Sequence, residues 1–193
     1  IPFTFVNEIG IEQTLVGGAV EALLDLTDEE AQTSSLLDLA SNRLVTLDAF
    51  SIDPDALSDT AAKAPDQTLD RLLETLEKDD HTATADGIRD LITTVNPSEG
   101  GLAKFTSRLE DVLERLAVED AVDTYAPSDE ATRSHRPAYE QSAWSAVERV
   151  LSSFDSVAPY LADQQPARRV RRALLAELVR GPRQQQGYVR VYP

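Results

Sequence analysis

The sequence predicts an all-α protein: an irregular multi-helix bundle of about seven helices with short strand-forming extensions at the N- and C-termini. Hydrophobic residues make up 41% of the 193 residues, and most are Leu, Ala and Val, beside one Trp, five Tyr and five Phe. This aliphatic composition favours helices packed through apolar stripes over a β-sandwich. The apolar residues also recur three and four positions apart, which is helical spacing.

Spacing and charge together divide the chain into three parts. Residues 1–10 form an extended N-terminal segment, residues 11–165 an acidic helical domain, and residues 166–193 a basic helix, hinge and strand-like arm. The length suffices for one well-buried core.

The opening stretch, IPFTFVNEIG, places Phe3 and Phe5 on one face of a short strand that ends in a turn at Gly10. The next stretch, IEQTLVGGAVEALLDL, has a helical stripe that includes the pair Gly17 and Gly18. Each glycine costs a helix about 1 kcal/mol relative to alanine, so the pair indicates close packing of this helix or a break within it. The expected stripe consists of Leu15, Val16, Ala19, Val20, Leu23 and Leu24.

A second helix is expected to start at the capping-box pair Thr27 and Glu30 and to run to about Asp48. A short third helix is expected after Pro54, because proline suits the first turn of a helix. The buried residues expected in the second helix are Leu37, Leu44 and Leu47.

Four one-sided stripes then predict helices over 66–78, 83–95, 102–125 and 138–156, the first of them introduced by Pro65. The 102–125 helix has the longest stripe, with heptad-like spacing and mixed charges on its outer face. The residues expected to be buried are, in order, Leu69, Leu72, Leu73 and Leu76; Ile88, Leu91, Ile92 and Val95; Leu102, Phe105, Leu109, Val112 and Leu116; and Val147, Val150, Leu151 and Phe154.

The C-terminal arm reads as three parts in series. A basic helix is expected over residues 167–180, after a linker that ends at Pro166; Gly181–Gly187 forms a hinge, and Tyr188–Pro193 alternates as a strand does. In the helix, an apolar stripe is expected with Arg171 beside it and two other arginines on the opposite side. The stripe consists of Val170, Leu174 and Leu178, and the opposite arginines are Arg169 and Arg172.

Charge is distributed very unevenly along the chain. Residues 1–164 contain 11 basic and 33 acidic side chains, whereas residues 165–193 contain seven arginines and one acid. With a net charge of −16, 19 Asp and only three Lys, the composition resembles that of proteins from salt-loving archaea. A GC-rich genome would also favour Arg over Lys, but it does not require so negative a charge. We therefore expect a virion or cytoplasmic protein of a high-salt organism, not one that spans a membrane, because no apolar run approaches about 20 residues.

Two loops have the composition of metal ligands: Asp53, Asp55 and Asp59 in one, and Asp79, Asp80 and His81 in the other. The first lacks the glycine and the final glutamate of a calcium loop, so a capped helix start is favoured. The second has no further histidine except His135, in a distant polar segment, so a solvated loop is favoured. No metal is expected at either loop.

Glu110 and Glu114 resemble the paired carboxylates of a di-metal bundle, but they lie opposite the apolar stripe of their helix. We therefore assign them to the solvated face, with Arg108 and Arg115 as their partners.

No motif points to catalysis. The chain has no phosphate-binding glycine loop and no nucleophile elbow. It has no cysteine, which excludes thiolate chemistry, disulfides and the common structural zinc sites. We expect a protein that is not an enzyme and has no cofactor.

The basic arm is the one feature that points to a partner, and three partners are possible. The arm could dock onto its own acidic body, reach a neighbouring subunit by adding a strand to an exposed edge, or bind nucleic acid phosphates. The acidic body would repel nucleic acid, and the helix has no interleaved aromatic residues, so a protein partner is favoured. The candidate partner-binding residues are Arg168, Arg169, Arg171, Arg172, Arg180, Arg183, Tyr188, Val189, Arg190, Val191 and Tyr192.

These observations predict a non-enzymatic structural protein of a larger complex, in contact with other protein subunits, of the same chain or of the larger assembly, through extended termini. Small helical bodies with a C-terminal arm are typical of ring-forming assembly proteins, such as the head–tail connectors of tailed viruses. This is an analogy of architecture. The acidic composition would fit a virus of a halophilic archaeon. The alternative is a regulatory or accessory subunit that contacts nucleic acid through its arginine-rich helix.

Overall fold

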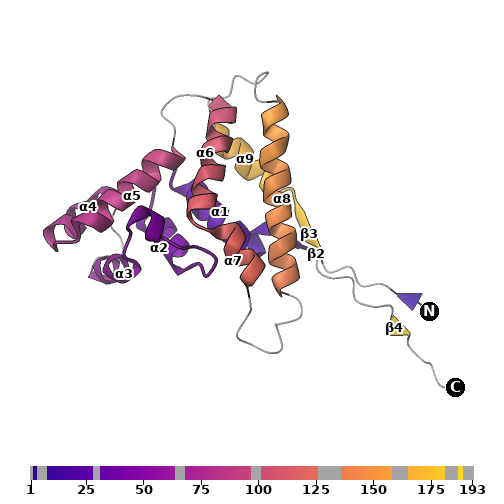
Figure 1. Cartoon of the computed structure of the whole chain (residues 1–193), viewed down its shortest axis with the longest axis horizontal. Helices are drawn as coiled ribbons and strands as arrows, with labels where there is room; N and C mark the ends of the chain where they lie inside the picture. The colour runs from indigo at the N-terminus through magenta and orange to yellow at the C-terminus, as the bar shows by residue number, and fades with distance from the viewer. Residues whose placement is uncertain are drawn as a thin grey trace.

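The computed structural model describes residues 2–3, 8–27, 31–63, 68–96, 101–125, 136–157, 165–180 and 187–188. These residues form nine α-helices and two small two-stranded sheets (Figure 1). The all-α class is confirmed. The helix number exceeds the expected seven or so, in part because the helix expected over 102–125 is two helices.

The α-helices are α1 (Leu15–Asp25), α2 (Thr33–Ser41), α3 (Pro54–Lys63), α4 (Leu69–Lys78), α5 (Thr82–Val95), α6 (Gly101–Arg115), α7 (Val118–Thr124), α8 (Arg136–Val157) and α9 (Pro166–Leu174). Two 3-10 helices, η1 (Ile11–Gln13) and η2 (Asp48–Phe50), precede α1 and α3. The strands are β1 (Pro2–Phe3), β2 (Glu8–Gly10), β3 (Leu178–Arg180) and β4 (Gly187–Tyr188).

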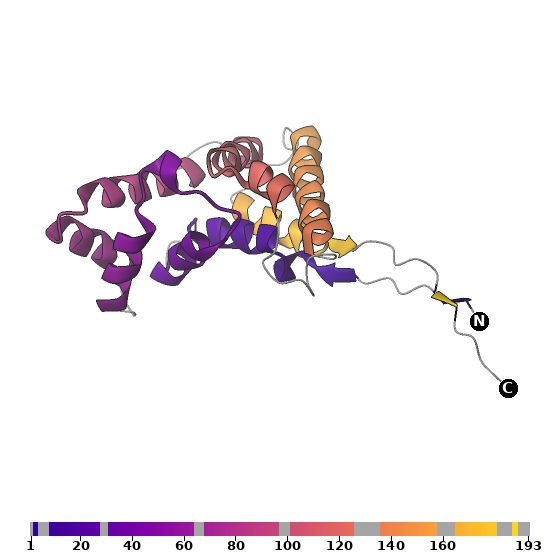
Figure 2. The same ribbon diagram turned by 60° about the horizontal axis from the view of Figure 1, so that its bottom comes forward.

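The helices are arranged from one end of the molecule to the other. In Figures 1 and 2, α3, α4 and α5 form one end, while α8 and the β1–β4 pair lie at the other. Between them, α6 packs against α5, α8 and α9, and α1 packs against α2, α8 and α9. One continuous apolar cluster runs through these contacts, from Leu36 and Leu57 to Phe105 and Val147. None of the described helices combines the length and apolarity that spanning a bilayer requires.

Helix α1 starts in a tightly packed turn. The Thr14 hydroxyl donates to the Ile11 carbonyl at 2.6 Å and accepts from the Gly17 amide at 2.9 Å, which caps the helix. A Cβ atom on Gly17 would lie 1.9 Å from the Ile11 carbonyl oxygen, so only glycine fits there. Of the two alternatives for the glycine pair, close packing is therefore the correct one.

A buried carboxylate from α8 also holds this turn. Glu140 is 3% exposed, and its two oxygens accept the backbone amides of Leu15 and Val16 at 3.1 and 3.0 Å. These are the first amides of α1, which have no acceptor within the helix and carry the positive end of its dipole. One side chain thus satisfies two buried donors and joins α1 to α8.

Helix α2 is shorter than expected. The predicted helix from Thr27 to Asp48 is wrong at both ends: Thr27 donates its hydroxyl to the Leu24 carbonyl at 2.7 Å, so it belongs to the end of α1. Glu30 lies outside the described residues. After α2, Asn42 accepts the Leu44 amide at 3.0 Å and donates to the Leu15 carbonyl at 2.8 Å, which turns the chain out of the helix. The predicted burial of Leu44 and Leu47 holds, but both lie in the following loop.

Helices α3, α4 and α5 follow the predicted order. Pro54 is the first residue of α3, as expected, and Pro65 lies outside the described residues. Helix α5 begins at Thr82, one residue before the predicted start, and ends at Val95 as predicted. The predicted apolar residues of α4 and α5 are buried except Leu69 and Ile92, which are half-buried.

The helix expected over 102–125 breaks at Ala117. That residue has φ of 54°, in the left-handed region, and the Leu116 carbonyl accepts the Thr46 amide at 3.0 Å. The break rotates the chain so that Leu116, Val118 and Val122 are all buried, which a straight helix could not achieve. The predicted apolar stripe of α6 is otherwise confirmed, as is that of α8.

Both termini form strands, as expected, and they pair with each other. Strand β2 runs antiparallel to β3, with Glu8 opposite Arg180 and Gly10 opposite Leu178. Strand β1 runs antiparallel to β4, with Pro2 opposite Tyr188. Figures 1 and 2 show the β1–β4 pair away from the helices, beyond α8. The predicted strand residue Phe5 and residues 189–193 lie outside the described residues.

We predict that Glu140→Gln lowers the free energy of unfolding by about 1–3 kcal/mol, because one buried amide loses its acceptor and the charge at the helix terminus is removed. Urea unfolding followed by circular dichroism at constant salt measures the change. Glu148→Gln, on the exposed face of the same helix, is the matched control and should change stability by less than about 0.5 kcal/mol. Equal effects of the two substitutions would contradict the role of Glu140.

Candidate subunit interface

The basic helix is built into the body of the molecule. Helix α9 begins with Pro166 and packs against α1, α6 and α8, with Val170 and Leu174 almost fully buried. Two of the three residues predicted for its apolar stripe are therefore confirmed. In the single chain, this helix therefore packs on its own acidic body, which was one of the three possibilities for the arm.

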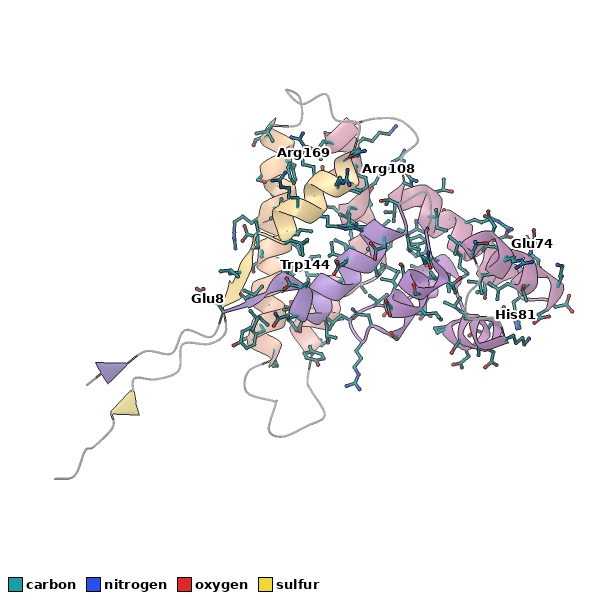
Figure 3. The ribbon with its side chains drawn as sticks, turned by 180° about the vertical axis from the view of Figure 1, so that it is seen from behind. Glu8, Glu74, His81, Arg108, Trp144 and Arg169 are labelled. Carbon is teal, nitrogen blue, oxygen red and sulfur yellow. The ribbon has the colours of Figure 1, made fainter. Side chains whose placement is uncertain are left out.

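The four arginines of α9 differ in exposure. Arg171 is half-buried and forms an ion pair with Asp25 of α1. Arg168, Arg169 and Arg172 are exposed, and Arg168 donates to the Gln165 side chain at 3.1 Å. Figure 3 shows Arg169 on α9 at the same end of the molecule as Arg108 of α6. Three of the predicted partner-binding arginines are thus on the surface, while Arg171 holds α9 in place.

The basic helix ends earlier than predicted. It stops at Leu174 instead of Arg180, and residues 178–180 form strand β3. Pairing with β2 is the physical reason: in the strand Val179 is fully buried, whereas Leu178, predicted to continue the helical stripe, is 61% exposed. Leu175 is also exposed, at 49%. Two exposed leucines beside the terminal strands are a feature that helical spacing could not reveal.

The remaining partner-binding residues belong to the terminal strands. Arg180 ends β3 opposite Glu8, and Tyr188 belongs to β4, opposite Pro2. Other candidates lie outside the described residues, so their role stays a prediction. They are Arg183, Val189, Arg190, Val191 and Tyr192.

The two aspartate-rich loops have structural roles. Asp53 accepts the backbone amides of Asp55 and Ala56 at 2.9 and 3.3 Å, so it caps α3 as predicted. In the second loop, Asp79 forms an ion pair with Lys63, and His81 is exposed. No group of three or more potential metal ligands comes together among the described residues, and His135 lies outside them.

The assignment of Glu110 and Glu114 to the exposed face is confirmed, but Arg115 does not pair with them. Arg115 forms an ion pair with Asp90 at 2.9 Å and lies over the Phe50 ring, 3.8 Å from its centroid. The partner is on α5 and the ring on η2, so the sequence spacing along α6 could not identify either.

A groove of about 400 Å³, which no sequence pattern predicts, lies between α8 and the α6–α7 pair. Glu110 and Glu114 line one side, and Trp144 and Glu148 of α8 line the other. The four-residue spacing of Trp144 and Glu148 placed them on one face of a helix, but nothing in the sequence showed which helix faces them.

Comparison with known proteins gives no assignment. No protein-family model matches the sequence, and neither a curated protein nor a solved structure matches it.

The ion pair of the second loop gives a pH prediction. The hydrogen bond and the charge of Lys63 hold the pKa of Asp79 below its ordinary value of 3.8. A lowered carboxyl pKa stabilises the folded chain at pH above the ordinary value, and this contribution is lost as the pH falls through the lower pKa of the folded state. In an NMR titration, Lys63→Gln should raise the Asp79 pKa, whereas Lys78→Gln, a nearby lysine paired with Glu74, should leave it unchanged. An Asp79 pKa that does not respond to Lys63→Gln would contradict the pairing.

Proposed function

We propose that the chain is a non-enzymatic assembly protein that contacts neighbouring protein subunits through its extended termini. The observation that carries this proposal is the position of the terminal strands. The two terminal segments pair first as β2–β3, which packs on α8 with Val179 buried, and then as β1–β4, which lies away from the helices (Figures 1 and 2).

A two-stranded sheet outside a core is suited to binding another chain. Each strand has one edge whose backbone groups are not bonded to the partner strand, and such an edge can accept a further strand. A two-stranded ribbon by itself is only marginally stable in water, so a neighbouring subunit would supply the missing contacts. Leu175 and Leu178, both exposed near β3, add an apolar surface of the kind that subunit contacts bury.

The finer proposal is a virion component such as a head–tail connector of a tailed virus of a halophilic archaeon. Its support is architectural analogy, a small helical body with protruding paired ends, together with the acidic composition. Fold alone does not define function, so this finer proposal depends on identifying the copurifying proteins.

A second candidate, contact with nucleic acid, is favoured by the exposure of Arg168, Arg169 and Arg172 on one helix. The surrounding acidic body opposes it, and Arg171 is already paired with Asp25.

The proposal predicts that the chain forms a defined multimer in molar salt and that deletion of residues 182–193 converts it to a monomer. The deletion removes Tyr188 and with it the β1–β4 pairing, but leaves the core untouched. Light scattering coupled to size exclusion measures the mass, and the helical circular dichroism should not change.

The matched control keeps the length of the arm. Gln184→Ser, Gln185→Ser and Gln186→Ser together alter the segment before β4 without removing a strand residue, so the multimer should persist. A full-length chain that is monomeric, alone and with its copurifying proteins, would contradict the proposal.

The nucleic acid alternative predicts different behaviour. Changing Arg168, Arg169 and Arg172 to Gln should then abolish binding to DNA or RNA, and binding by the unmodified chain should weaken steeply as salt rises. Electrophoretic mobility shifts at several salt concentrations measure this. Absence of binding at the lowest salt at which the chain is folded would eliminate the alternative.

A further inference from the structure

The groove between α8 and the α6–α7 pair has a chemically uniform rim. Its lining includes five carboxylates and no lysine or arginine. The carboxylates are those of Glu110, Glu114, Glu119, Asp120 and Glu148, all on exposed residues. Its volume of about 400 Å³ lies within the range of about 300–1,000 Å³ that binding pockets commonly have.

The floor of the groove is apolar and aromatic. Trp144 and Ala117 are half-buried there, above the fully buried side chains of Leu113, Val147 and Leu151. The indole nitrogen of Trp144 is buried and meets no acceptor among the described residues. An aromatic floor inside an acidic rim favours a ligand that combines cations with apolar side chains, because a guanidinium can pair with carboxylates and stack on an indole.

Four acids of the groove differ from several other acids of the surface in having no ion pair within the described part of the chain. Asp25, Glu77, Asp79 and Asp90 each form an ion pair with an arginine or lysine. Within the described part of the chain, no side chain or backbone amide donates to the carboxylates of four groove residues. These are Glu114, Glu119, Asp120 and Glu148. Neighbouring like charges repel one another, so an incoming cation would relieve repulsion as well as form contacts.

We propose that this groove binds the C-terminal segment, residues 181–193, of a second copy of the chain. The inference rests on the proposed function and names the partner surface for it. The segment is GPRQQQGYVRVYP: it contains Arg183 and Arg190, no acid, and two tyrosines and two valines. Its charge and its apolar content both complement the groove, and the adjacent strand β4 is part of the protruding end of the chain.

A neighbouring copy supplies the segment because of where the chain ends lie. In Figures 1 and 2 the β1–β4 pair lies on the side of α8 that faces away from α6 and α7, while the groove lies on the side toward them. Strand β4, the described part of the segment, therefore lies across α8 from its own groove, which favours the groove of the next subunit as the binding site. Repeated contacts of this head-to-tail kind generate rings or filaments.

Fluorescence tests the inference directly, because Trp144 is the only tryptophan of the chain and lines the groove. The synthetic peptide of residues 181–193 is titrated into the full chain with Arg183→Glu and Arg190→Glu, whose own segment then cannot compete. The titration uses the lowest salt at which circular dichroism shows the chain folded. We expect a saturable change of the Trp144 emission, and none with a peptide in which both arginines are Glu.

Substitutions in the groove locate the binding site. Glu114→Arg with Glu148→Arg should weaken peptide binding about tenfold or more, since each attraction becomes a repulsion. Asp111→Arg with Asp123→Arg makes the same charge change on exposed residues of α6 and α7 outside the groove, and should alter affinity by less than about threefold. If the charge reversal unfolds the chain, the neutral variant Glu114→Gln with Glu148→Gln replaces it in the binding measurement. An emission change that is absent, or equal in all variants, overturns the inference.

A mixing experiment decides whether the segment acts between copies. The groove-reversed chain, Glu114→Arg with Glu148→Arg, retains a functional segment, and the segment-reversed chain, Arg183→Glu with Arg190→Glu, retains a functional groove. Each alone should fail to multimerise, and their mixture should form a one-to-one complex. No complex on mixing overturns the inference even if the peptide binds, because the segment would then serve its own chain. If the groove-reversed chain still multimerises, this inference fails while the proposed function stands; a monomeric unmodified chain contradicts the proposed function instead.

Discussion

The packing of α1 against α8, at the centre of the helical core, depends on the Glu140 carboxylate. It lies fully inside the protein at the start of α1, and its two oxygens accept the first two amides of that helix. Burying a charge is costly unless it is hydrogen-bonded, and here the partial positive charge of the helix terminus compensates it. Since α8 also contacts α6, α7, α9 and β3, this carboxylate sets α1 relative to the rest of the core.

A strongly acidic chain uses its few cations at the junctions between elements. Arg171 joins α9 to α1, Arg115 joins α6 to α5, and Arg149 joins α8 to the turn before β3 through Glu177. Pairs as exposed as these contribute little to stability one by one, but they favour one arrangement of the helices over others. The groove is lined by five carboxylates and by no arginine or lysine, so its charge is opposite to that of the C-terminal segment.

Helices whose burial is decided by their own spacing were predicted accurately. The limits of α5 and α8 lie within two residues of those expected, and their apolar stripes are buried except for the half-buried Ile92. Prediction failed where a distant contact overrides the local pattern. Ala117 adopts a left-handed conformation next to Leu116, whose carbonyl accepts the backbone amide of Thr46. Leu178 lies in a strand instead of the predicted helix because its segment pairs with β2. The basic arm of the candidate interface could be predicted from the sequence, whereas the acidic groove could not.

The sequence by itself determined the helical class, the acidic character of the body and the basic character of the C-terminal segment, because these follow from composition and from spacing within single helices. Only the tertiary structure decided that the two chain ends pair with each other, that α9 packs into the core, and that carboxylates of three helices surround one tryptophan. Each of these depends on which elements become neighbours. The packing of apolar faces and the pairing of buried polar groups such as Glu140 decide this, and both involve residues that are far apart in the sequence.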